Sequence, residues 1–210
     1  MTDASVDLYW LPLGAGGCSV RWNGRAYEAL VAHREARAPK DLYHSALEVR
    51  LDGARYVIEM APVWNVGAPD RGVVGEGPVG SRLLGRSRWF RYEVRRWRDG
   101  VIPDVAEAVA SPVRVSADAD RARRVLELVP LFTTATWGRD EQCTGDMWNS
   151  NSLVSWCLAR TGHDVALIAP PLGGRAPGWT AGLVVARRRL RRQPLVDGGE
   201  PVRPVQRLSA

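Results

Sequence analysis

Cysteine and histidine are scarce in this chain of 210 residues, and each scarcity excludes a class of site. The cysteines, Cys18, Cys143 and Cys157, form an odd set without CxxC or Cys/His spacing, which argues against a disulfide framework and against a zinc centre. The chain contains no HExxH, Walker, GxSxG or EF-hand spacing. We therefore expect neither a metal nor another cofactor.

Long apolar runs are missing as well. None reaches the roughly 18 residues that a membrane span requires. The first residues are acidic at Asp3 and Asp7, and they lack the basic-then-apolar layout of a signal peptide. A cytoplasmic protein without a membrane span is the expectation.

Lysine occurs only at Lys40, so arginine supplies nearly all of the positive charge. The formal net charge is +6, and seven of the 29 basic residues but only two of the 23 acidic residues lie after residue 186. The sequence thus predicts one nearly neutral domain over residues 1–186 and a basic, disordered tail over 187–210. The run Arg187–Arg192 either contacts an anionic partner or is simply a solvated tail.

Strand signals fill the first half of the chain. Two turn dipeptides typical of β-hairpins, Asn23-Gly24 and Asp52-Gly53, each separate a pair of β-rich runs. Residues 65–80 are rich in glycine and proline and predict a long surface loop. The expected strands are 6–13, 19–22, 26–32, 42–51, 55–61, 87–97 and 179–186.

Helix signals come later. We expect a short helix over 103–110, a stronger one capped by Ser116 and ending near Val129, and a third from Ser150 to Thr161 with Gly162 as its stop. Hairpins followed by helices indicate an α+β fold with an antiparallel sheet packed against helices. The glycines at 14–17 lead into a strand and not a helix, so they do not indicate a phosphate-binding loop.

His44 is the histidine that stands out, because it begins an otherwise apolar strand. A hairpin at Asp52-Gly53 would bring Glu59 within diagonal reach of His44. A carboxylate beside an imidazole is typical of a general base with its orienting partner. A salt bridge across the surface of the sheet is the alternative.

Asparagine and serine cluster at the start of the third helix, in Asn149-Ser150-Asn151-Ser152. Helix capping explains much of this composition. A helix start also suits a nucleophile or an oxyanion, because its free N–H groups stabilise negative charge. Cys157 falls on the apolar face of the same helix, so we expect it in the core.

These segments resemble a family. His44 and Val49, followed by Tyr56-Val57-Ile58-Glu59-Met60-Ala61, are similar to the histidine and glutamate strands of circularly permuted NlpC/P60-like proteins, which have a papain-like fold and include relatives of lecithin retinol acyltransferase. Ser150-Asn151-Ser152-Leu153-Val154 resembles the context of the family's nucleophile, with serine in place of cysteine. The resemblance covers residues 40–162. The whole chain also resembles actinobacterial proteins, which implies no function.

The resemblance implies a hydrolase or acyltransferase that acts on an amide or ester. Ser150 would be the nucleophile, His44 the base and Glu59 its orienting partner, with Asn149 and Asn151 at the oxyanion. The substrate would be a small molecule or a peptide. The alternative is a catalytically inactive papain-like scaffold that serves as a binding module, because a serine cannot ionise at a helix start as a cysteine does.

Overall fold

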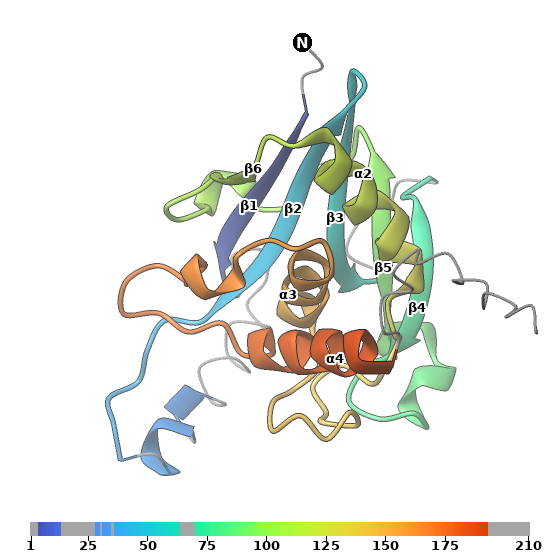
Figure 1. Ribbon diagram of the computed structural model, residues 1–210. Helices are drawn as coiled ribbons and strands as arrows, with labels where there is room; N and C mark the ends of the chain where they lie inside the picture. The colour runs from blue at the N-terminus through green and yellow to red at the C-terminus, as the bar shows by residue number, and fades with distance from the viewer. Residues whose placement is uncertain (1–3, 14–27, 30, 35, 64–69, 193–210) are drawn as a thin grey trace, which may run out of the picture.

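The computed structural model describes residues 4–13, 28–29, 31–34, 36–63 and 70–192, which form an α+β fold around a six-stranded sheet (Figure 1). The strand order is β4-β5-β3-β2-β1-β6, and every neighbouring pair is antiparallel. The strands are β1 (Ser5–Pro12), β2 (Tyr43–Leu51), β3 (Ala54–Pro62), β4 (Val73–Pro78), β5 (Arg91–Arg98) and β6 (Val113–Ser116).

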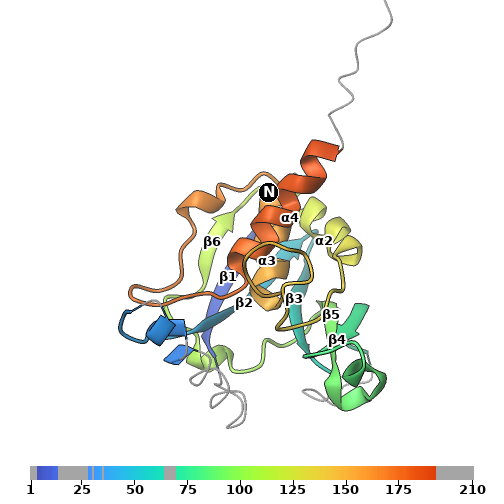
Figure 2. The ribbon, with the colours of Figure 1, turned by 90° about the horizontal axis from the view of Figure 1, so that it is seen from below.

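Three α-helices gather on one face of this sheet (Figures 1 and 2). The helices are α2 (Ala119–Leu128), α3 (Ser150–Arg160) and α4 (Trp179–Arg192). Helices α2 and α3 contact the strands directly, and α4 packs against α3. No helix of the described ranges combines the length and the apolar character needed to cross a membrane.

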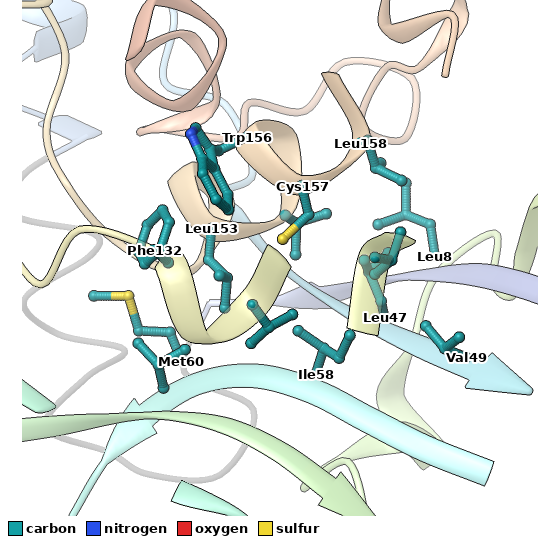
Figure 3. Close-up of a cluster of buried hydrophobic side chains, with 14 of the residues drawn as sticks. Leu8, Leu47, Val49, Ile58, Met60, Phe132, Leu153, Trp156, Cys157 and Leu158 are labelled. Atoms are coloured by element: carbon teal, nitrogen blue, oxygen red, sulfur yellow. The ribbon is translucent and has the colours of Figure 1, made fainter. Parts of the chain in front are cut away.

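The main core lies between the sheet and helices α2 and α3. Alternate residues of β2, among them Leu47 and Val49, point towards the helices and meet Leu153 and Cys157 of α3 (Figure 3). The intervening residues point to the other face, where Leu11, Ala46, Val57 and Ile102 form a second, smaller cluster. This alternation decides which side chains of the sheet can reach α3.

Several sequence predictions are confirmed. The hairpin at Asp52-Gly53 joins β2 to β3, with Leu51 opposite Ala54 and Arg50 opposite Arg55. Helix α3 covers the predicted range to within one residue. Helix α2 begins after its cap Asp118, two residues later than expected.

Other predictions are wrong. Residues 28–29 and 31–32, expected in a strand, are helical, as are residues 33–34, and the buried residues Glu28 and Ala32 show the i, i+4 spacing of a helix. Part of the predicted loop over 65–80 is strand β4, and the predicted helix over 103–110 contains only the 3-10 turn Val105–Glu107. Strand β6 was not expected.

The largest correction concerns residues 179–192, which form helix α4 instead of a strand and a disordered tail. Ala181 and Val185 are buried four residues apart. Gly182 lets α4 approach α3 closely, because a Cβ there would lie 2.1 Å from the Ser155 hydroxyl. The arginine run therefore continues a helix beyond the predicted boundary at residue 186. The rest of the predicted tail, 193–210, and the predicted hairpin at Asn23-Gly24 lie outside the described residues.

Candidate functional site

The start of helix α3 is a capping box, as its composition suggested. The Asn149 side chain accepts a hydrogen bond from the backbone N–H of Asn151 at 2.9 Å, and the Ser152 hydroxyl accepts one from the N–H of Asn149 at 3.1 Å. The Asn149 amide donates to the carbonyl of Pro177 at 2.8 Å. Asn149 therefore caps α3 and also binds the segment that precedes α4.

Asn151 links three parts of the fold. Its side-chain oxygen accepts a hydrogen bond from the Ser45 hydroxyl at 2.8 Å, and its amide donates to the carbonyls of Tyr43 at 2.9 Å and Pro177 at 2.8 Å. Asn151 is buried, and so is Ser45 of β2. Both side-chain amides are therefore bound within the protein. The oxyanion role was predicted for backbone N–H groups, and those of Asn149 and Asn151 donate to the side chains of Ser152 and Asn149.

His44 points away from Ser150. Its neighbour Ser45 faces α3, and successive side chains of a strand point to opposite faces of the sheet. His44 lies opposite Leu11 of β1, which belongs to the second cluster on the face without helices. Burial lowers the pKa of His44 to about 4, so the ring is neutral at pH 7.

Glu59 lies on the same far face. Its neighbours Ile58 and Met60 belong to the main core beside the helices, so the Glu59 side chain projects to the other side of the sheet. The predicted set of Ser150, His44 and Glu59 is therefore wrong as a triad, because the sheet separates the two β residues from the helix start.

Glu59 is held by an arginine in place of the histidine. The buried Arg95 binds Glu59 at 2.7 Å and Glu93 at 2.9 Å, and Arg71 binds Glu93 at 2.6 Å. Burial raises the pKa of Glu59 although the guanidinium of Arg95 opposes that shift. At Glu93, burial is outweighed by the hydrogen bonds from Arg71 and Arg95, which lower the pKa. This buried charge network was missed in the sequence.

The surroundings of Ser150 are filled. Ser150 exposes only 3% of its surface, and Trp148, two residues earlier, is buried and stacks on Phe132 with ring centroids 4.8 Å apart. An active nucleophile needs an open cleft beside it.

A cleft of about 530 Å³ opens instead at the start of α4, and we call it the α4 cleft. Its residues come from helical residues 31–34, from the loop before α3, from the loop that enters α4, and from the first turn of α4. They are Val31, Arg34, Gly145, Asp146, Arg175, Ala176, Pro177 and Thr180. Ser150, His44 and Glu59 do not line it.

The charged side chains of the α4 cleft differ in how far other groups of the protein already bind them. Asp146 accepts hydrogen bonds from backbone N–H groups, including that of Gly178 at 2.8 Å, and so caps the start of α4, while burial raises its pKa. Arg175 contacts Glu28 at 3.2 Å. Arg34 is exposed and has no acidic side chain within 4 Å among the described residues. None of the cleft residues was predicted from the sequence to take part in a site.

Among the residues that the structure describes, no group of three or more histidine, cysteine, aspartate or glutamate side chains could hold a metal ion. A scan of protein-family models finds no match to this sequence, and searches of curated proteins and of solved structures find no similar chain.

Proposed function

We propose that this protein is a non-catalytic binding module that takes a small anionic ligand, with a carboxylate or phosphate group, in the α4 cleft. The observation that carries the proposal is the pair of arginines, Arg34 and Arg175, which line one cleft from two separate segments. Guanidinium groups present several donors in a fixed plane that matches carboxylate and phosphate oxygens. A volume of about 530 Å³ lies in the range of small-molecule sites.

The remaining charges of the cleft favour an anion. The carboxylate of Asp146 is occupied by N–H groups at the start of α4, so it repels an incoming anion less than a free carboxylate would. Glu28 is shared between Arg175 and Arg37 and lies buried beneath them. Arg34 remains available to a ligand from solvent.

The papain-like scaffold is part of this proposal. Support comes from the position of α3, which lies against β2 and β3 with its first turn hydrogen-bonded to β2. The residue of β2 that faces this turn is Ser45, whereas the histidine is one position away and on the other face. Such an arrangement is what we expect of a papain-like domain that keeps its architecture without the chemistry.

The competing proposal is an amide or ester hydrolase or acyltransferase with Ser150 as nucleophile. It requires a base within hydrogen-bond reach of the Ser150 hydroxyl, and His44 on the far face cannot supply one without a large rearrangement. A serine-directed phosphonate probe separates the two proposals. Labelling that disappears in Ser150→Ala would support the enzyme and contradict the binding module.

Calorimetric titration of the full chain with inorganic phosphate, citrate and glutamate tests the module directly. We expect at least one of these anions to bind. Arg34→Gln should lower the affinity for that anion about 10- to 100-fold, the usual loss for a charge-assisted hydrogen bond. Arg98→Gln is the matched control, because Arg98 is exposed at the end of β5 and lies outside the cleft. Equal binding by wild type and Arg34→Gln, or no binding of any anion at millimolar concentration, would overturn the proposal.

A further inference from the structure

The connection between β4 and β5 exposes apolar side chains that the fold does not need there. Residues 81–90, which we call the β4–β5 cap, contain two 3-10 turns, Leu84–Arg86 and Arg88–Phe90. Leu83 and Trp89 are 70% and 73% exposed, and Leu84 and Phe90 are exposed as well. The cap lies at one end of the sheet beside β4 and β5 (Figures 1 and 2). Exposed apolar groups clustered in this way mark interaction surfaces.

The backbone of the cap is ordered. The N–H of Gly85 donates to the carbonyl of Ser81 at 3.1 Å, that of Phe90 donates to Ser87 at 3.0 Å, and that of Val79 donates back to Phe90 at 2.8 Å. Gly85 is buried against β4, where an added Cβ would lie 2.4 Å from a side-chain carbon of Pro78. The apolar side chains are thus presented by a fixed turn, which reduces the entropy lost on binding.

The charge of the cap is positive. Arg86 and Arg88 are exposed, and among the described residues no acidic side chain lies within 4 Å of either guanidinium. The nearby acids are already engaged, because Glu141 binds Arg82 at 2.9 Å and Glu76 binds Arg91 at 2.8 Å. The two free arginines therefore flank the apolar side chains without compensation.

We propose that the β4–β5 cap docks on an anionic lipid bilayer. Leucine, phenylalanine and tryptophan side chains enter the boundary between headgroups and acyl chains, where tryptophan is the preferred aromatic residue. Arg86 and Arg88 remain at the level of the anionic headgroups, where each cation strengthens binding by about fivefold. Single-stranded nucleic acid fits less well, because Leu83 and Leu84 offer no ring on which a base can stack.

This surface is separate from the α4 cleft, since the two share no residue. A module that binds a small anion in the α4 cleft and a membrane through the β4–β5 cap would bring that anion to the bilayer surface. Either site can fail its test without affecting the other.

Flotation of the full chain with lipid vesicles tests the docking. We expect binding to vesicles of 30% phosphatidylserine in phosphatidylcholine, weak binding to pure phosphatidylcholine, and loss of binding as salt is raised. The double variant Trp89→Ser/Phe90→Ser should bind at least 10-fold more weakly. Leu172→Ser is its control, because Leu172 is fully exposed. The loop before α4, to which it belongs, lies on the other side of the molecule from the β4–β5 cap (Figures 1 and 2).

Charge reversal tests the second part of the surface. Arg86→Glu/Arg88→Glu should weaken vesicle binding at least 10-fold and flatten its salt dependence, whereas Arg98→Glu should leave both unchanged. Brominated lipids should quench tryptophan emission in the wild type and much less in Trp89→Phe, which reports insertion independently of charge. No binding to anionic vesicles, equal binding by all variants, or retention by a single-stranded oligonucleotide but not by vesicles would overturn the proposal.

Discussion

Replacing Asn151 by alanine removes the side chain that joins β2, α3 and the loop before α4. Three hydrogen bonds disappear, to the Ser45 hydroxyl and to the carbonyls of Tyr43 and Pro177. At about 1 kcal/mol each, their loss costs about 3 kcal/mol. The buried hydroxyl of Ser45 loses its acceptor, which raises the total towards 4 kcal/mol, while Pro177 still accepts from Asn149. We expect the free energy of unfolding to fall by about 3–4 kcal/mol.

Ser150→Ala is the matched control, because Ser150 is the preceding residue in the same helical turn. Its hydroxyl has no hydrogen-bond partner among the described residues, and alanine is a better helix former than serine. The free energy of unfolding should change by less than about 0.5 kcal/mol. Urea denaturation monitored by circular dichroism measures both values, and the melting temperature should fall by about 6–16 °C in Asn151→Ala.

A double-mutant cycle with Ser45→Ala isolates one of the three bonds. The two substitutions should be non-additive, with a coupling of about 1 kcal/mol or more, because Ser45 and Asn151 contact each other directly. A cost below about 1 kcal/mol for Asn151→Ala, or a cost above about 2 kcal/mol for Ser150→Ala, would refute the conclusion that the polar cluster is structural.

Three further outcomes follow from buried groups. Cys157→Ala should lower the free energy of unfolding by about 1–3 kcal/mol, because it leaves a small cavity in the core. In the folded wild type, mass spectrometry should find Cys157 unlabelled by thiol reagents, because burial raises the pKa of the thiol and excludes the reagent. The pKa of His44 is about 4 in the folded protein and about 6.5 in the unfolded chain, so the unfolded state binds the proton first as the pH falls. Up to about 3 kcal/mol of stability is therefore lost between pH 6.5 and pH 4. Urea denaturation at several pH values should show a smaller loss in His44→Leu than in the wild type. Arg95→Met should cost about 3–5 kcal/mol in the same assay, because it leaves Glu59 and Glu93 buried beside each other, and adding Glu59→Gln should restore part of that stability.

The position of His44 shows where sequence reasoning succeeded and where it failed. The register of the hairpin correctly placed His44 and Glu59 on the same face of the sheet, because side chains alternate strictly along a strand. The same alternation also indicates which face of the sheet His44 occupies. In β2 the apolar residues Leu47, Val49 and Leu51 share one parity, whereas His44 has the other parity and faces away from the main core.

The sequence by itself determined the local elements whose signals lie within a few residues. The turn at Asp52-Gly53 specifies the β2–β3 hairpin, and the cap residues together with Gly162 specify the ends of α3, because these interactions are formed by neighbours in the chain. Only the tertiary structure decided the rest. Whether 179–186 was strand or helix depended on the packing of Gly182 against α3. Whether Glu59 would bind His44 or Arg95 depended on the pairing of β3 with β5. Both are contacts between distant segments, which no local sequence pattern encodes.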